Sequence, residues 1–496
     1  MFAPEIPHVN FSNVQVQNYL SQQSLSLLSQ PVTPQEIDKV ILSSNSDKAP
    51  GVDGLNAEFY KSCWSIIKDD VIAAILEFFR TGKILNEVNI TSITLIPKKE
   101  NTNSFSDYHP LSICKMIYIF ISKLIANRLK VVLPDLISST QHAFIRGRLI
   151  HENIALCHSL MHNYHLISGQ KRMSIKVDLH KAYDSVRWDF LLQLLCLHGF
   201  PTMMISWIRA CVSYPSFTIN INGSSVGFFR SSRGLRQGCP MAPFLFLIVM
   251  QHLSSRLDDL VRQGMITPHP SCANPLITHL AFADDLIIFA EASESNARGI
   301  KDVLGSFADI SGQSASITKS NLYMAGCSRD LMNRVQDILG IPIGTLPTRF
   351  LGVPLITKQL TYNDCLPLIE SIQSRIHSWK AKYLSYMGRL SLIKSGLQVR
   401  TCKILSAIPE GPLYELDAFQ APLVPEPTNC PSSSSSKQTM ESNRPLRLQS
   451  FFLESALTRE GMDLLHLKGI RVALYGSYGT VDRIVRFIYA LLKVII

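Results

Sequence analysis

The sequence predicts an α+β fold, because patterns typical of helices and of short strands alternate along the chain to about residue 400. Apolar runs on both sides of two adjacent acids in Ala281–Phe289 predict a hairpin that turns at Asp284 and Asp285. Alternating polar and apolar residues in Ser174–Asp178 predict a half-buried strand. Helical spacing over Ile113–Val132 predicts a long helix. The strand that ends at Asp178 and the hairpin that turns at Asp284 and Asp285 therefore both carry acidic residues at a strand end.

The composition is that of a folded protein with a preference for polyanions. Of 496 residues, 46% are hydrophobic and 17% charged, which suits two or more subdomains with buried cores. The 48 Lys and Arg against 38 Asp and Glu give a formal net charge of +10, which favours nucleic acid or an acidic membrane surface as partner. Many soluble proteins share this balance, so the motifs must decide.

The cysteines and the chain ends indicate an intracellular protein that is neither secreted nor membrane-spanning. Its 11 cysteines are scattered without a CxxC pair, which favours neither a disulfide framework nor a zinc knuckle. The first ten residues lack the continuous apolar region of a secretory signal. The apolar stretch Phe487–Ile496 is shorter than the roughly 20 residues that span a bilayer.

Capping and turn residues predict further elements. Residues 1–30 are polar and predict no definite structure, whereas Thr33 and Glu36 form a capping box that opens a helix. A second helix is predicted through Phe59–Ile67, and a strand over Ile93–Ile96.

The adjacent acids Asp284 and Asp285 are the strongest local signal for chemistry. Two carboxylates between otherwise buried strands repel and desolvate each other unless a cation lies between them, which favours a hard divalent metal. A polar turn explains the same residues, since Asp is common in turns. The pair by itself leaves both interpretations open.

A third acid, Asp178, favours the metal. It lies near the end of its predicted strand, and three carboxylates from two strands could hold the two Mg²⁺ ions that nucleotidyl transfer needs. Asp184 and Asp189 compete for this role, but they fall on the following helical stretch and are better explained as a structural cap and a surface charge.

The segment Gly234–Pro240 is a candidate nucleotide contact. Its glycines let the backbone approach a nucleotide closely, and Gln237 next to Gly238 offers a side-chain amide. A plain turn would explain the glycines alone.

In order along the chain, several blocks resemble the motifs of non-LTR (LINE-type) retrotransposon reverse transcriptases, and the similarity covers about residues 31–398. The palm blocks are Lys176–Asp184, Gly234–Pro240, Phe282–Asp285 and Phe350–Pro354. Further blocks are Lys48–Gly54, Leu95–Lys98, Asp107–Ser112, Gln141–Arg148, Trp379 and Leu384–Lys394.

This resemblance implies roles for single residues. Asp178, Asp284 and Asp285 would be the catalytic ligands of two Mg²⁺ (or Mn²⁺) ions, and Lys319 would assist the pyrophosphate leaving group. Tyr183 would be the steric gate against a ribose 2′-hydroxyl, and Gln237, Gly238 and His109 would contact the nucleotide. Template and primer contacts would come from Lys98, Arg148, Arg236 and the turn at Gly352. A packed core tyrosine, a solvated lysine and an apolar hairpin are the structural alternatives for Tyr183, Lys319 and Gly352.

The resemblance also implies a right-hand polymerase with fingers, a palm built on a small antiparallel sheet, and a helical thumb. Its partners would be an RNA template, a DNA primer or target DNA, and deoxynucleotides, with the nucleus as the compartment. The regions expected are a polar segment (1–30), fingers and the start of the palm (31–170), palm (171–345), primer-grip turn and thumb-like helices (346–408), a Pro/Ser-rich linker (409–440) and a divergent segment (441–496).

Some positions depart from the family pattern. His109 stands where an arginine is usual, Cys239 replaces an acid, Ala242 a serine, and Ser316 an asparagine. A mostly neutral imidazole is a poorer phosphate ligand than a guanidinium. These departures favour a second hypothesis, a catalytically silent, decayed or maturase-like nucleic-acid-binding protein. A metal-dependent phosphohydrolase is a third hypothesis, which leaves the Gln237 block without a role.

Overall fold

The computed structural model describes residue 11, residues 14–355 with gaps at 100, 105–106, 167–168 and 273–274, and residues 357, 366 and 370. The chain divides into two compact units, Met1–Asn153 with Leu166–Thr345, and Ile154–His165 with Leu346–Ile496. The expected thumb-like helices, the linker and the segment 441–496 lie outside the described residues.

A four-stranded antiparallel sheet in the first unit carries the predicted acidic hairpin. Its strand order is β6-β7-β3-β8, and the bounds are β3 Arg172–Val177, β6 His279–Phe282, β7 Asp285–Ala290 and β8 Asn321–Ala325. Both the predicted strand and the predicted hairpin are confirmed. The centre of this sheet is apolar, since β7 is buried from Leu286 to Ala290.

A second four-stranded sheet lies in the same unit, in the order β2-β1-β4-β5. It comprises β1 Ile90–Pro97, β2 Tyr108–Cys114, β4 Ser216–Ile221 and β5 Ser224–Arg230. The predicted strand at Ile93–Ile96 is confirmed within β1. The β4–β5 hairpin turns at Asn222 and Gly223, whose φ angles are 51° and 82°. An Asn-Gly pair is the usual two-residue hairpin turn, so a local sequence signal marks this hairpin.

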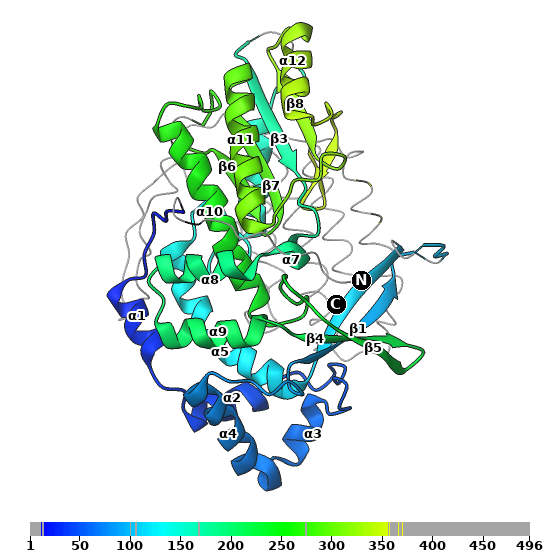
Figure 1. The fold of residues 1–496 in the computed structure, drawn as a ribbon. Helices are drawn as coiled ribbons and strands as arrows, with labels where there is room; N and C mark the ends of the chain where they lie inside the picture. The colour runs from blue at the N-terminus through cyan, green and yellow to red at the C-terminus, as the bar shows by residue number, and fades with distance from the viewer. Residues whose placement is uncertain are drawn as a thin grey trace, which may run out of the picture. The chain divides into compact units, whose positions relative to one another are not determined.

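Helices pack around both sheets. Figure 1 shows α10 (Ala242–Arg262) running through the middle of the first unit, with α11 (Glu294–Ser311) beside the first sheet and α5 (Met116–Leu136) towards the second. The remaining helices of this unit are α1 Gln22–Ser29, α2 Pro34–Leu42, α3 Ala57–Ser62, α4 Trp64–Thr81, α7 Ala182–Ser185, α8 Trp188–Leu197, α9 Thr202–Val212 and α12 Arg329–Leu339. Helix α6 (Ile150–Met161) begins in the first unit and continues into the second. Among the described residues, no helix is long and apolar enough to cross a membrane.

The predicted N-terminal helices are partly corrected. Thr33 caps α2 by accepting from the Glu36 amide at 3.2 Å, as predicted. The Glu36 carboxylate, however, pairs with the Arg128 guanidinium at 2.9 Å. The single helix predicted through Phe59–Ile67 is wrong, because the chain breaks at Cys63 into α3 and α4. In the N-terminal segment, Ser21 caps α1, which buries Leu28.

The described part of the second unit contains a short hairpin of β9 (Thr348–Phe350) and β10 (Val353–Leu355). It turns at Leu351 and Gly352, which both have positive φ, 51° and 82°. This geometry is typical of a two-residue hairpin turn, and it explains the glycine.

Candidate active site

The three predicted acids lie at one end of the first sheet. In the antiparallel register, Val177 of β3 pairs with Leu286 of β7. The next residues outward are Asp178 and Asp285, and directly opposed residues of such strands have Cα atoms about 4.5–5.5 Å apart. Asp284 occupies the turn before Asp285 and is exposed, as Asp285 is, whereas Asp178 is half-buried. The backbone therefore places all three acids at the same end of the sheet.

Backbone and hydroxyl groups of a second segment fix Asp178. Its amide donates to the Ser320 hydroxyl at 3.1 Å, and its carbonyl accepts from the Ser316 amide at 2.7 Å. Ser320 is buried, and its hydroxyl also donates to the Ser316 carbonyl at 2.8 Å. The segment that contains Lys319 thus lies directly against Asp178. The Lys319 residue itself is exposed.

Tyr183 lies close to the acidic turn. Desolvation and the negative charge of Asp284 together raise the pKa of Tyr183 to about 12. Its ring stacks on Phe246, with centroids 4.8 Å apart. Both the packed-tyrosine explanation and the steric-gate prediction agree with this position, because the ring is packed on one face and its hydroxyl lies near a predicted metal ligand.

The predicted nucleotide-binding residues converge on helix α7. Gln237 donates its side-chain amide to the Asp184 carboxylate at 3.4 Å. Desolvation raises the pKa of Asp184, while Lys181, Gln237 and His109 act in the opposite direction. The structure thus brings His109 of β2 and Gln237 to the same exposed carboxylate, one residue after Tyr183. Asp184, expected as a structural cap, thus also accepts from Gln237 beside the predicted nucleotide contacts.

Close backbone approaches explain the two glycines of the Gly234–Pro240 segment. A Cβ at Gly238 would lie 2.8 Å from the Ser112 carbonyl oxygen, and one at Gly234 would lie 2.7 Å from the Asp184 carbonyl oxygen. Both glycines also have positive φ, 105° and 97°. The segment is therefore locked between α7 and the second sheet.

Asp189, expected as a surface charge, is exposed but also has a structural role. It lies in the first turn of α8, where its carboxylate accepts from the Phe190 amide at 2.8 Å. It also pairs with the guanidinium of the buried Arg187 at 2.6 Å.

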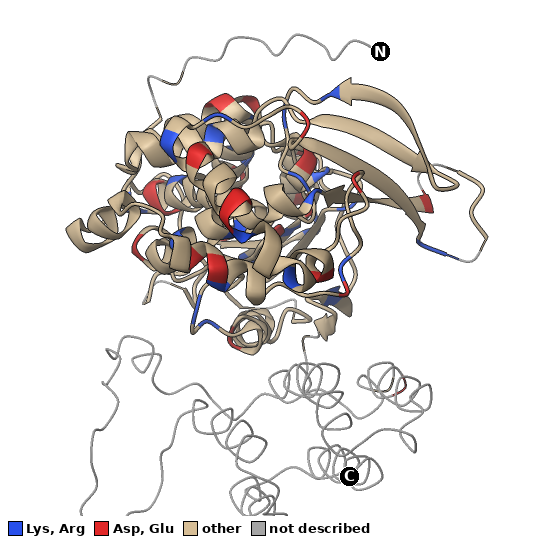
Figure 2. Ribbon diagram, turned by 90° about the horizontal axis from the view of Figure 1, so that it is seen from below, with Lys and Arg blue, Asp and Glu red and all other residues tan. Residues whose placement is uncertain are grey.

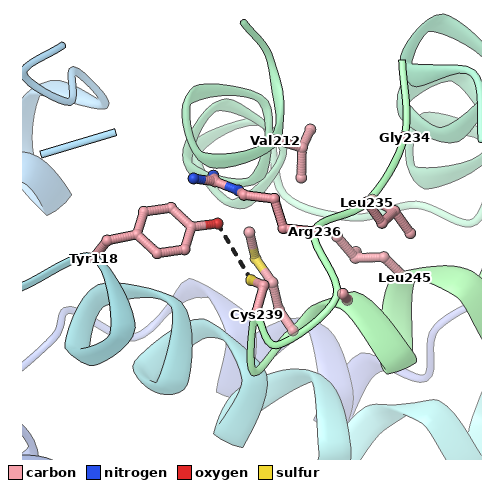
Figure 3. Close-up of a pocket in the computed structure, with 9 residues that line it drawn as sticks. Tyr118, Val212, Gly234, Leu235, Arg236, Cys239 and Leu245 are labelled. Carbon is pink, nitrogen blue, oxygen red and sulfur yellow. Dashed lines mark hydrogen bonds between the residues drawn. The ribbon is translucent and has the colours of Figure 1, made fainter. Parts of the chain in front are cut away.

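Arg236, predicted to contact template or primer, is buried inside the protein, and this prediction is corrected. Its guanidinium lies over the Tyr118 ring at 3.8 Å and donates to Thr91 Oγ1 at 3.1 Å and to the Cys211 carbonyl. It lines a cavity of about 10 Å³, in which the Tyr118 hydroxyl and Cys239 Sγ lie 3.2 Å apart in a hydrogen bond. Figure 3 shows this bond as a dashed line, with the Arg236 side chain beside it. Arg236 is 7% exposed and cannot reach a nucleic acid. The sequence motif alone does not reveal this burial.

Arg148, also predicted to contact template or primer, is occupied by the backbone. Its guanidinium donates to the carbonyls of Ile137 at 2.9 Å and Gln141 at 2.6 Å, and also to that of Ser138. Desolvation lowers the pKa of Arg148. Arg148 therefore holds the loop 137–148. Because its guanidinium is bound to backbone carbonyls, the structure does not support the predicted nucleic-acid contact.

The other predicted contacts remain at the surface. Lys98 is exposed at the end of β1, where its neighbour Lys99 pairs with Asp107 at 2.9 Å. Arg128 of α5 is buried against Glu36, so it is not available to a nucleic acid. Figure 2 shows Lys and Arg interspersed with Asp and Glu over the helices. Gly352 belongs to the second unit, in the hairpin turn already described.

The donor chemistry of the acidic end suits a hard divalent cation, because carboxylate oxygens are the ligands that Mg²⁺ prefers. Within the described ranges, no three His, Cys, Asp or Glu side chains are gathered closely enough to form a metal-ligand cluster. Mg²⁺ usually takes one or two carboxylates together with substrate phosphates and waters, so an all-protein cage is not required. The residues present therefore fit a metal that is completed by substrate.

Sequence reasoning missed two residues that hold the acids. Ser320 anchors Asp178, and Gln141 contacts the backbone of Ala283 in the acidic turn. Gln141 lies within the block Gln141–Arg148 and Ser320 directly follows Lys319, but neither position has a residue type that suggests chemistry. Only the three-dimensional contacts identify them.

The comparisons with known proteins agree with this site. Residues 96–355 match the family model described as "Reverse transcriptase (RNA-dependent DNA polymerase)". The chain therefore belongs to the reverse transcriptase family. Its similarity to proteins of non-LTR retrotransposons confirms the more specific resemblance, that of a LINE-type reverse transcriptase domain.

Three relatives illustrate that similarity. The "Transposon TX1 uncharacterized 149 kDa protein" of Xenopus laevis is 25% identical over 75% of this chain and 28% of its own length. The "Retrovirus-related Pol polyprotein from type-1 retrotransposable element R2" of Nasonia vitripennis is 26% identical over 55% of this chain and 25% of its own length. The "type-2 retrotransposable element R2DM" Pol polyprotein of Drosophila melanogaster is 24% identical, over 54% and 24% respectively. The chain thus spans about a quarter of the length of these relatives.

Proposed function

We propose that this protein is an RNA-directed DNA polymerase of a LINE-type retroelement, which extends a DNA primer with deoxynucleotides on an RNA template. The observation that carries the proposal is that Asp178 and Asp285 directly follow the last paired residues of β3 and β7, Val177 and Leu286, at one end of the sheet, where the charge of Asp284 also acts on Tyr183. Action on target DNA would place the protein in the nucleus.

Asp178, Asp284 and Asp285 would hold two Mg²⁺ (or Mn²⁺) ions. When bound, such ions activate the primer 3′-hydroxyl and neutralise the triphosphate leaving group. The three carboxylates would fix the positive charge of these ions at the end of the first sheet. Tyr183 would exclude a ribose 2′-hydroxyl, and Gln237 with Gly238 would line the nucleotide site. Lys319, exposed in the turn between Ser316 and Ser320, which both contact Asp178, would face the leaving pyrophosphate.

His109 favours a second function, a silent nucleic-acid-binding protein. It occupies an exposed position on β2 that faces Asp184, where a guanidinium would supply a permanent charge and a bidentate fork for the triphosphate. An imidazole supplies less of both. On this basis we expect weaker nucleotide binding. A polymerase would show it as a raised KM for deoxynucleotides, and a silent protein would bind RNA without extending a primer.

The test is Mg²⁺-dependent extension of a DNA primer on an RNA template by the purified protein, beside the double variant Asp284→Ala, Asp285→Ala. Extension that disappears in the variant supports the polymerase. RNA binding without extension in the unmodified protein supports the silent binder. Release of phosphate from simple esters without a primer would support a phosphohydrolase instead.

A further inference from the structure

The turn that carries Asp284 is conformationally unfavourable. Ala283, the residue before it, has φ 57°, in the left-handed region that residues with a Cβ seldom adopt. Asp284 and Asp285 are exposed and of like charge, so their own side chains offer the turn no apolar packing. Something else must hold the backbone of this turn in place.

The side chain of Gln141 makes the required contacts. Its Oε1 accepts from the Ala283 amide at 2.9 Å and from the Ala143 amide at 3.0 Å, and its Nε2 donates to the Ala283 carbonyl at 3.4 Å. Two N–H donors converge on one atom, which identifies that atom as the amide oxygen. The Gln141 side chain thus forms hydrogen bonds with both the amide and the carbonyl of Ala283.

Gln141 is itself held rigidly. It is 2% exposed, and its carbonyl accepts from Arg148 at 2.6 Å. The backbone beside it pairs with β6, because the His142 amide donates to the Ala281 carbonyl at 3.1 Å and the Ala281 amide donates to the Thr140 carbonyl at 3.0 Å. The loop 137–148 therefore acts as a further edge of the first sheet.

We propose that Gln141 is a positioning residue for the polymerase reaction, which fixes the Ala283 backbone so that Asp284 and Asp285 face the metal site. The inference rests on the proposed function. An apolar side chain of similar length would fill the same space, but it would leave the buried amide and carbonyl of Ala283 without their partners. The turn could then relax, and a displacement of about 1 Å at a reacting centre costs on the order of 10²-fold in rate.

The test compares Gln141→Met, which removes both the acceptor and the donor, with Gln141→Glu. Burial favours the protonated form of this Glu, which keeps the acceptor oxygen and donates from its hydroxyl to the Ala283 carbonyl. Gln251→Met is the matched control: Gln251 is also buried and accepts from the Ser138 amide at 2.8 Å, at the start of the same loop, without touching the turn. Two quantities are measured: amide hydrogen exchange at Ala283, and kcat, KM and the half-saturating Mg²⁺ concentration for primer extension.

For Gln141→Met we expect exchange at Ala283 to accelerate at least tenfold, with kcat lowered on the order of 10- to 100-fold and a higher Mg²⁺ requirement. The KM for primer–template should change less than about twofold. Gln141→Glu should keep Ala283 protected, and Gln251→Met should alter stability without altering the Mg²⁺ requirement.

Unchanged exchange at Ala283 in Gln141→Met overturns the inference, and so does acceleration at all amides together, which is a merely structural effect. If the unmodified protein extends no primer, the proposed function fails. In that case the exchange measurement still decides whether Gln141 holds the turn.

Discussion

The two sheets of the first unit have the same number of strands but opposite surroundings. In the sheet that carries the acids, β7 is buried from Leu286 to Ala290. In the other sheet, all seven residues of β5 are exposed, and Phe228 is 69% exposed. The central strand of the first sheet is thus buried, whereas the outer strand of the second presents apolar side chains to solvent.

This difference indicates a division of labour. A buried sheet deforms little, because close-packed neighbours resist small displacements, so carboxylates at its end keep their positions. An exposed sheet with aromatic side chains leaves a surface that a ligand could cover. The proposed chemistry needs the first property, and contact with a nucleic acid would use the second.

The largest expected effect is at the end of the buried sheet. Asp178→Asn should reduce primer extension about 10³- to 10⁴-fold, or roughly 4–5 kcal/mol of transition-state stabilisation, because a neutral amide binds Mg²⁺ poorly. Asp189→Asn, which removes a carboxylate paired with Arg187, is the control and should keep most activity. Single-turnover rates measure both. The reverse order of losses would show that the ligand was misassigned.

The next effect compares the two sheets directly. Phe289→Ala should lower the free energy of unfolding by about 3–5 kcal/mol, because Phe289 is 1% exposed in the centre of β7. The same change at the exposed Phe228 should cost less than about 0.5 kcal/mol. Urea unfolding of the two variants measures the difference. Equal losses would mean that the second sheet is covered in solution.

Substitution of Arg236 tests whether this basic residue of the Gly234–Pro240 segment stabilises the fold or binds nucleic acid. Arg236→Met should cost about 2–3 kcal/mol of unfolding free energy, because Thr91 and the Cys211 carbonyl lose a buried donor. The exposed Arg233→Ala should cost less than about 0.5 kcal/mol. The dependence of RNA affinity on salt should be unchanged in Arg236→Met. A shallower salt dependence would instead restore the predicted template contact.

The smallest expected effect is the pH dependence of stability that comes from the buried His252 in α10. Burial, with a smaller contribution from Arg256, lowers the pKa of His252 from 6.5 to about 4. Since the unfolded chain takes up this proton first, the stabilisation is complete above about pH 6.5 and is lost as the pH falls towards about 4. At pH 5 the loss should be about 1–2 kcal/mol. His252→Leu should therefore unfold with a smaller difference between pH 7.5 and pH 5 than the unmodified protein; an identical difference would contradict the assignment.

Local patterns predicted the elements whose residues act on their nearest neighbours. The alternation in Ser174–Asp178 predicted β3, and the apolar runs on both sides of Asp284 predicted the hairpin. The prediction of one continuous helix through Phe59–Ile67 was wrong, because no strong local signal marks the break at Cys63. The β4–β5 hairpin was not predicted, although the Asn222–Gly223 pair is typical of such a turn.

The sequence by itself determined the family, the strands that end in acids, and the position of those acids at the strand ends. These follow from residue type and spacing, which are local properties. The tertiary structure alone decided which polar side chains are buried. Arg236 and Arg148 donate to backbone carbonyls rather than to a nucleic acid. Gln141 forms hydrogen bonds with a turn residue 142 positions away in the sequence. Burial depends on segments that are distant in sequence, so no local pattern encodes it.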